Sequence, residues 1–271
     1  MIRADYHMHS SYSGDSDAKQ ESMILSAINK GITHICFTDH QDFDFPVDEE
    51  CPAGYFEFNT DQYFFDVAML KAKYDELISI NIGVELGMQE HLAESNDVYV
   101  GQYDFDFVIA SSHLCHGKDP YRARFYEGRT EKEAYHEYFQ SIYDNIKLFQ
   151  NFDVYGHLDY ALRYGPTKNQ NFVFDEYKEE IDKILHILID NGKGIEVNTS
   201  GYAKGMNGPN PCKDIILEYK KLGGEILTIG SDAHKPADIA ADYDKAEALI
   251  KECGFDHYYI FNQRKPEVMR F

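Results

Sequence analysis

Short runs of β-branched and aromatic residues alternate with longer amphipathic stretches along this chain. The apolar runs predict eight strands, at residues 2–6, 33–37, 79–84, 107–110, 154–155, 194–197, 226–229 and 258–261. Between them, apolar residues recur at helical spacing and predict helices at residues 18–30, 61–77, 131–149, 174–191, 214–222 and 239–253. Gly31, Gly192 and Gly223 follow three of these helices, where a left-handed residue commonly ends a helix.

This alternation of strand and helix indicates parallel strands joined by crossover helices. Such strands form either a closed barrel or a doubly wound sheet. Neither GxGxxG nor GxxxxGK[ST] follows the first run, so the nucleotide-binding open sheet lacks its usual marker and a barrel is favoured. Two irregular stretches, 41–60 and 114–130, are expected to fold over one end of it. No repeat or linker divides the chain, so we expect one domain over residues 1–271.

The charge balance bears on the choice of partner. The chain has 47 Asp and Glu residues against 26 Lys and Arg, a formal net charge of −21, and no basic stripe interrupts it. Nucleic-acid binding draws most of its affinity from Lys and Arg, so this composition disfavours such a partner. A phosphate substrate would need positive charge from bound metal. A small phosphate that also carries a cationic group suits this acidic chain.

Cysteine usage and hydropathy indicate the compartment. The five cysteines are widely spaced and contain no CxxC pair, which argues against a disulfide scaffold and a zinc ribbon. The N-terminus, MIRADYHMHS, lacks an apolar signal core, and no apolar run is long enough to span a bilayer. We therefore expect a cytoplasmic protein without a membrane partner.

Polar side chains of metal-ligand type follow seven of the eight predicted strands. They are His7, His9, Asp39, His40, Glu85, His113, His116, His157, Asp159, Glu196, Asn198, Asp232 and His234. In a parallel barrel these strand ends meet at one rim, where such enzymes place their sites. A single histidine there is more often a structural residue than a ligand. His7 and His9, however, are two residues apart on an extended segment, so both point to the same side and can chelate one ion.

Nucleophilic sites explain less of this pattern. Ser111, Ser112 and Ser231 lie beside the cluster, but no GxSxG elbow is present. Cys115 beside histidines could act as a thiolate, yet it leaves the other carboxylates and imidazoles without a role. Metal-dependent hydrolysis accounts for all of them.

The motifs DYHMHS, TDH, GVELG, SSHLCHG, GHLDY, EVNTSG and GSDAH stand in this order between Asp5 and His234. Together they resemble the polymerase-and-histidinol-phosphatase (PHP) superfamily. The chain length, GHLDYALRY and the closing FNQRKP are most similar to its histidinol-phosphatase branch. The resemblance implies an α/β fold, a distorted (β/α)7 TIM-like barrel, in which the run at 258–261 would be peripheral.

The resemblance also implies two or three divalent transition metals: zinc, manganese or iron. Carried over by motif, the first ion would be held by His7, His9, Glu85 and Asp232. The second would share Glu85 and add His113 and His157. The third would take Asp15, His40 and His234. Many relatives have histidine where this chain has Asp15, but a carboxylate is also a competent ligand for these metals.

The implied activity is that of a phosphoric monoester hydrolase that converts L-histidinol phosphate to L-histidinol and phosphate in histidine biosynthesis. Two adjacent ions would activate a water and neutralise the phosphoryl oxygens. The catalytic candidates are Glu85, His234 and His40. The substrate-binding candidates are Arg163, Lys204, His116, Asp159, Glu196 and Asn198. Proton delivery to the leaving group stays open among His234, His40 and His116.

Some side chains admit two interpretations. Asp42, Asp44 or Glu196 would hold the cationic end of histidinol phosphate, whereas Glu196 could equally orient a ligating histidine. Arg163 and Lys204 are the candidate phosphate clamps, and either could be an ordinary solvated cation.

Three alternatives remain open at the level of function. A PHP phosphoesterase for another small phosphate or a nucleotide would share the same ligands. A PHP exonuclease needs a DNA-binding surface that the net charge of −21 disfavours. A non-catalytic metal-binding module would keep the fold but not the turnover.

Overall fold

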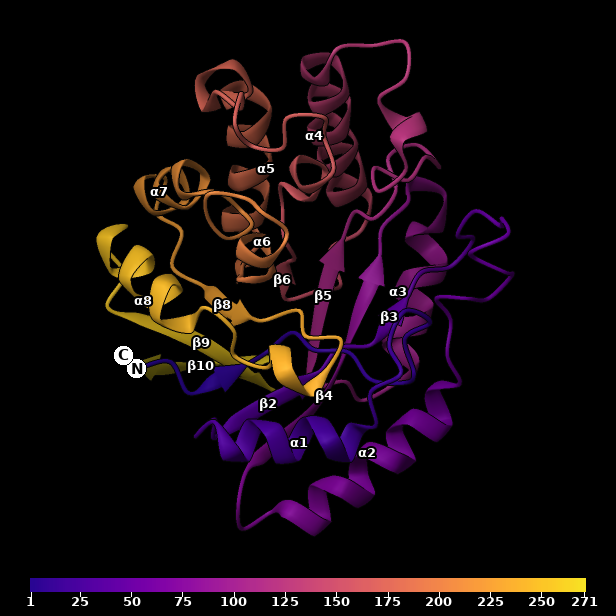
Figure 1. The fold of residues 1–271 in the computed structure, drawn as a ribbon, viewed down its shortest axis with the longest axis vertical. Coiled ribbons are helices and arrows are strands. Elements are labelled where there is room, and N and C mark those ends of the chain that lie inside the picture. The colour runs from indigo at the N-terminus through magenta and orange to yellow at the C-terminus, as the bar shows by residue number, and fades with distance from the viewer.

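A computed structural model describes residues 1–271 and places a curved parallel sheet at the centre of the chain (Figure 1). Seven strands pair in the order β1-β2-β4-β5-β6-β7-β8, and β3 pairs with β4 beside this path. The strands are β1 (Ala4–Asp5), β2 (His34–Phe37), β3 (His40–Gln41), β4 (Ser79–Gly87), β5 (Phe107–Ser111), β6 (Val154–Tyr155), β7 (Gly194–Asn198) and β8 (Leu227–Gly230).

The first and last strands of this path come together and nearly close the barrel. Tyr6 donates its backbone N–H to the carbonyl of Ile229 at 3.0 Å, and Asp232 donates to the carbonyl of His7 at 2.8 Å. A parallel bridge between Met8 and Ala233 continues this contact beyond the strand ends. The expected distorted seven-stranded TIM-like barrel is therefore confirmed.

Helices cover the outside of the barrel. They are α1 (Gln20–Asn29), α2 (Thr60–Tyr74), α3 (Ala93–Gln102), α4 (Glu131–Leu148), α5 (Lys178–Asp190), α6 (Ser200–Ala203), α7 (Lys213–Lys221) and α8 (Tyr243–Glu252). Short 3-10 turns are η1 (Glu90–Leu92), η2 (Ala123–Phe125), η3 (Tyr160–Arg163), η4 (Phe174–Glu176) and η5 (Pro236–Asp238). Figure 1 shows α4 and α5 packed side by side, at the opposite end of the molecule from α1 and α2.

Local sequence explains where several helices begin and end. The Thr130 hydroxyl accepts the Glu133 N–H and the Glu133 carboxylate accepts the Thr130 N–H, so two of the free donors at the start of α4 are satisfied. The predicted left-handed residues after α1, α5 and α7 are present, because Gly31, Gly192 and Gly223 all have positive φ.

The C-terminal residues form a separate antiparallel hairpin of β9 (His257–Asn262) and β10 (Lys265–Arg270). The expectation that residues 258–261 lie outside the barrel is thus confirmed. The hairpin lies against the N-terminal ends of the barrel strands. Tyr6 donates its hydroxyl to the Phe261 carbonyl at 2.9 Å, and Arg264 Nε donates to Asp153 Oδ2 at 2.6 Å. This packing fills the end of the barrel that carries no candidate ligands.

Four helices and strands were not predicted: β3, α3, the four-residue α6 and β10. The first has only two residues, and α3 has few apolar positions, with Asn96, Tyr99 and Val100 as its buried residues. Every residue of β10 is at least partly exposed, so it lacks the apolar run that marks a strand. No helix has both the length and the apolar character needed to cross a bilayer.

Candidate metal centre

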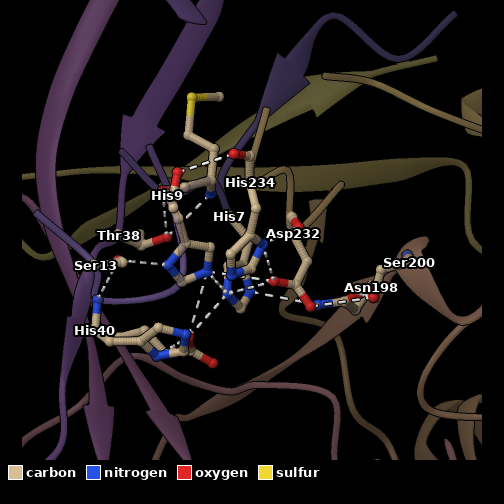
Figure 2. A network of polar contacts seen from close by, with 12 residues as sticks. His7, His9, Ser13, Thr38, His40, Asn198, Ser200, Asp232 and His234 are labelled. Atoms are coloured by element: carbon tan, nitrogen blue, oxygen red, sulfur yellow. Dashed lines mark hydrogen bonds and ion pairs between the residues drawn. The ribbon is translucent and has the colours of Figure 1, made fainter. Parts of the chain in front are cut away.

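The candidate ligands gather at the C-terminal ends of the barrel strands, and Figure 2 labels part of this group. They are His7, His9, His40, Glu85, His113, His157, Asp232 and His234. The segment after β1 is extended, so His7 and His9 project to one side while Met8 between them is fully buried. Thr38 Oγ1 accepts the N–H of Met8 at 3.1 Å and fixes this segment.

The first group consists of His7, His9, Glu85 and Asp232. The Nε2 atoms of His7 and His9 are 3.1 Å apart, and Glu85 Oε2 lies 3.2 and 3.5 Å from them. Asp232 Oδ1 lies 3.7 Å from His7 Nε2 and 3.3 Å from His9 Nε2. Two imidazole nitrogens and two carboxylate oxygens converge on one point, which is the donor set of a transition-metal site.

The second group contains Glu85, His113 and His157. The other oxygen of Glu85, Oε1, lies 3.1 Å from His113 Nε2 and 2.8 Å from His157 Nε2. Each Glu85 oxygen therefore faces a different group of histidines, and the fully buried Glu85 carboxylate stands between them. One side chain with this orientation can hold two cations close together.

The third group lies nearer the surface and consists of Asp15, His40 and His234. Asp15 Oδ2 is 3.1 Å from His234 Nε2 and 3.7 Å from His40 Nε2. The Asp15 side chain keeps 39% of its surface exposed, in contrast to the buried Glu85. The His9 ring stacks between the rings of His40 and His234 at centroid distances of 4.3 and 4.1 Å, which joins this group to the first.

The histidine rings are oriented by partners on their far side. His7 Nδ1 lies 2.5 Å from Glu196 Oε1, and His9 Nδ1 lies 3.0 Å from Ser13 Oγ. Asp42 Oδ1 lies 2.9 Å from His113 Nδ1. A proton held at Nδ1 leaves the lone pair of Nε2 directed at the cluster, as metal ligation requires.

The donor set fits divalent metal ions on physical grounds. Glu85 Oε2 and His40 Nδ1 are buried 3.0 Å apart, and neither atom makes a well-oriented hydrogen bond. Burying such atoms without a partner is costly, and a cation between them removes that cost.

The pKa shifts of the residues in the cluster also favour metal binding. Burial would raise the pKa of Glu85, but the imidazoles of His7, His113 and His40 outweigh it and hold that pKa well below its usual range. Burial would lower the pKa of His113, yet the carboxylates of Asp42 and Glu85 raise it to about 10. In contrast, burial and the neighbouring imidazoles of His234 and His40 lower the pKa of His9 to about 3. The carboxylates of this cluster thus demand compensating positive charge, which metal ions supply.

A cavity of about 610 Å³ opens onto these groups. Its lining includes His40, His113, His157, Asp232 and His234, together with Arg163, Lys204, Ser200, Tyr160 and Phe56. The stretches at 41–60 and 114–130 contribute Glu50, Cys51, Tyr55, Asp119 and Arg122 to its wall. They therefore fold over this end of the barrel, as the sequence predicts.

Arg163 presents its guanidinium to this cavity from η3. Its Nε donates to Asn210 Oδ1 at 2.6 Å, its Nη2 to Asn198 Oδ1 at 2.9 Å, and its Nη1 to Asp232 Oδ2 at 3.1 Å. The side chain is 3% exposed. A guanidinium has five N–H donors, so about two remain for a ligand. The orientation of this buried cation beside the metal cluster suits a phosphate group.

Comparison with known proteins identifies the family of this chain. Residues 5–200 match the PHP domain family. The chain is 34% identical to a histidinol-phosphatase of Lactococcus lactis subsp. lactis (strain IL1403), over 98% of this chain and 96% of that one. It is 30% identical to a probable histidinol-phosphatase of Clostridium acetobutylicum, over 92% and 93% of the two chains.

The chain belongs to the PHP domain family.

A solved structure extends this likeness to the fold. The histidinol phosphate phosphatase from Lactococcus lactis, crystallised with zinc, L-histidinol and phosphate, superposes on this PHP domain with a TM-score of 0.88. The two sequences are 33% identical, and the match covers 98% of each chain.

Several sequence candidates lie elsewhere in this PHP domain. His116 contacts Glu90 at 3.5 Å and lines a different cavity. Asp159, Glu196 and Asn198 are buried, bonded to protein atoms, and outside the lining of the main cavity. The geometry therefore gives these four a poor position for direct substrate contact, whereas Arg163 and Lys204 both reach the cavity.

The two aspartates expected at the cationic end of the substrate also differ from expectation. Asp42 lines the cavity but is only 5% exposed, and its two oxygens face His113 Nδ1 at 2.9 Å and His40 Nδ1 at 3.4 Å. Asp44 points outwards, with 69% of its side chain exposed and His91 at 3.1 Å. Neither is free to bind an ammonium or imidazole group in the cavity.

The alternative role expected for Glu196, that of orienting a ligating histidine, fits its contact with His7, but other residues that support the ligands were not predicted. Ser13 bonds His9 Nδ1 and the backbone N–H of His40, and Asp39 in turn accepts from Ser13 and Ser10. Asn210, which orients Arg163, was also missed. The only signal for Ser13 and Ser10 was their place in the polar segment after β1, and Asn210 has no comparable signal.

Proposed function

We propose that this chain hydrolyses L-histidinol phosphate to L-histidinol and phosphate at a centre of two or three divalent metal ions. One observation carries the proposal: Glu85 turns its two oxygens to two groups of histidines beside a cavity that also holds a buried arginine. The likeness to histidinol-phosphatases over nearly the whole chain supports the substrate. The lactococcal relative contains zinc, L-histidinol and phosphate. A cytoplasmic location is part of the same proposal.

The ligand assignment is as follows. His7, His9, Glu85 and Asp232 would hold one ion, and Glu85, His113 and His157 a second. Asp15, His40 and His234 would hold the third. When bound, zinc, manganese or iron would lower the pKa of a water at the centre and neutralise charge on the phosphoryl oxygens.

The protein's own residues position the substrate. Arg163 would bind two phosphoryl oxygens through its remaining N–H groups, because Asn198 and Asn210 hold the guanidinium in place. Lys204 lines the same cavity and would add a second positive charge. His234 and His40 also line it, whereas His116 does not, so the first two are placed to deliver a proton to the leaving alkoxide when the third ion is absent.

The cavity wall suits the other end of histidinol phosphate. Asp119 supplies a carboxylate for the ammonium or imidazolium group, and Tyr160 and Phe56 supply aromatic surface for the imidazole ring. Asp119 is 8% exposed, and its Oδ1 accepts the N–H of Tyr121 at 2.8 Å. Asp119 replaces Asp42 and Asp44 as the acidic contact of the substrate.

Replacing Asp42 tests this reassignment. Asp42→Asn removes the carboxylate that orients His113, so kcat/KM should fall roughly ten- to hundredfold for histidinol phosphate and an aryl phosphate alike. Asp44→Asn is the matched control and should change neither value, because its side chain is exposed. Steady-state kinetics on both substrates decide the point. A loss confined to histidinol phosphate would return Asp42 to the substrate's cationic end.

The function itself is tested by complementation. The gene should restore growth without histidine to a bacterial strain that lacks its own histidinol-phosphatase, and the Glu85→Gln variant should not. Immunoblotting of the soluble fraction establishes that both proteins are present. No growth with the folded, unmodified protein present at normal levels would contradict the proposed substrate.

A further inference from the structure

Glu196 is a buried carboxylate that touches two candidate metal ligands from different strands. It lies in β7, is 1% exposed and does not line the substrate cavity. We propose that Glu196 is a positioning residue that orients His7 of the first metal group and His157 of the second at the same time. This inference rests on the proposed metal centre, and it assigns a role to a residue that contacts neither substrate nor metal.

The first contact fixes the ring of His7. Glu196 Oε1 lies 2.5 Å from His7 Nδ1, and both side chains are buried from solvent. The carboxylate holds the proton on Nδ1, so the lone pair of His7 Nε2 faces Glu85 Oε2 at 3.2 Å. Without this partner the ring could flip or change tautomer, and either change would remove the lone pair from the ligand position.

The second contact fixes the backbone at His157. Glu196 Oε2 accepts the His157 N–H at 2.9 Å and the Asn198 Nδ2–H at 3.2 Å. His157 has a φ of 21°, a region that residues with a side chain rarely occupy. The bond to Glu196 therefore helps to hold the turn after β6 in the conformation that brings His157 Nε2 to Glu85 Oε1.

The surrounding backbone leaves room for this carboxylate. A Cβ atom on Gly230 would lie 2.5 Å from Glu196 Oε1 and 2.2 Å from His7 Cβ. A Cβ atom on Gly156 would lie 2.5 Å from Ser111 Oγ and 3.5 Å from Glu196 Oε2. A side chain at position 230 would thus displace the pair of Glu196 and His7, whereas one at position 156 would clash with Ser111 and meet Glu196 only at ordinary contact distance.

The donors around Glu196 make Glu196→Gln an informative substitution, because it removes an acceptor and keeps the size of the side chain. Three N–H groups, from His7, His157 and Asn198, point at two carboxylate oxygens. Glutamine has nearly the same size but replaces one acceptor oxygen with an NH2 group, so at least one donor would face another donor. The ligands would lose their orientation while the packing volume stays the same.

The test compares metal affinity in Glu196→Gln and in a matched control, Asp153→Asn. Asp153 is also a buried carboxylate, which accepts the Val108 N–H at 2.8 Å and an Arg264 N–H at 2.6 Å, but it precedes β6 at the far end of the barrel. Zinc affinity is measured by competition with a chromophoric chelator, alongside thermal unfolding of each apoprotein. Glu196→Gln should bind zinc about ten- to hundredfold more weakly, and Asp153→Asn should lose thermal stability but keep its zinc affinity.

Kinetics give a second readout. Turnover by Glu196→Gln should fall at limiting zinc and recover in part with excess zinc, whereas KM for an aryl phosphate should change little. Unchanged zinc affinity in Glu196→Gln would overturn the proposal. So would an equal loss of zinc affinity in both variants, because that would make the effect a general consequence of destabilisation.

A measurement on the unmodified protein covers the case in which Glu196→Gln does not fold. In zinc-loaded protein labelled with ¹⁵N-histidine, the ring of His7 should be the tautomer with its proton on Nδ1, and a proton on Nε2 would overturn the proposal. Failure of the proposed function is separate, because it would show as zinc binding without hydrolysis of histidinol phosphate.

Discussion

Glu85→Gln should reduce kcat/KM for any phosphomonoester by roughly a thousandfold or more, while the protein remains folded. Glutamine keeps the size of the side chain but lacks the negative charge that lets one residue hold two cations. Each Glu85 oxygen faces its own set of imidazole nitrogens, at 3.2 Å from His7 and 2.8 Å from His157. The variant should therefore lose at least one of the ions held by these groups.

Metal analysis and kinetics on the same samples measure this effect. The unmodified protein, purified without chelators under metal-replete conditions, should contain at least two transition-metal ions per chain. Glu90→Gln is a suitable control, because Glu90 is largely exposed and contacts His116 outside the metal groups. Near-normal turnover by Glu85→Gln, or less than one ion per chain in the unmodified protein, would exclude a binuclear mechanism.

Arg163→Ala should raise KM for every phosphomonoester about ten- to hundredfold, equivalent to roughly 1.5–3 kcal/mol for a lost hydrogen bond to a charged group. The effect should be uniform, because the phosphate is the group that all these substrates share. Arg163→Lys should recover little, since an ammonium cannot reproduce the planar contacts to Asn198 and Asn210.

KM values for histidinol phosphate, an aryl phosphate and a nucleotide, with inhibition constants for inorganic phosphate, report this effect. Lys204→Ala is the comparison variant, and its effect should be smaller because Lys204 is exposed. Arg163 also contacts Asp232, so the metal content of each variant is measured in parallel. A loss confined to one substrate would assign Arg163 to the leaving group instead of the phosphate.

The fold was predictable because its main signals are local. Apolar runs such as 107–110 and 194–197 mark buried parallel strands, and Gly31 and Gly192 mark the helix ends between them. The barrel then follows from the alternation of strand and helix, since right-handed crossovers leave few other arrangements. Elements without a local apolar pattern, such as the exposed β10, could not be recognised in this way.

Grouping of the candidate ligands could also be predicted, because parallel strands place their C-terminal ends at one rim. Glu196 was a candidate for orienting a ligating histidine, but the partner of each orienting residue could not be predicted. Glu196 lies 189 residues from His7 in the chain, and Arg163 lies 47 residues from Asn210. Such pairs depend on side-chain directions that only the folded barrel defines.

Asp42 shows how burial in the fold changes the role expected of a residue. Its place in a polar insertion suggested contact with the substrate. In the fold it lies so close to Gly87 that a Cβ atom there would be 1.7 Å from Asp42 Oδ1. Only glycine at position 87 allows the carboxylate to enter the site and meet His113.

The central claim is tested most directly by comparing kcat/KM for L-histidinol phosphate with that for an aryl phosphate and a nucleotide monophosphate. The unmodified protein is loaded in turn with zinc, manganese and iron. The account predicts that L-histidinol phosphate exceeds the other two by at least about tenfold with its best metal, because charged contacts to its cationic end add to the shared phosphate contacts. Equal or lower efficiency for L-histidinol phosphate with all three metals would contradict it.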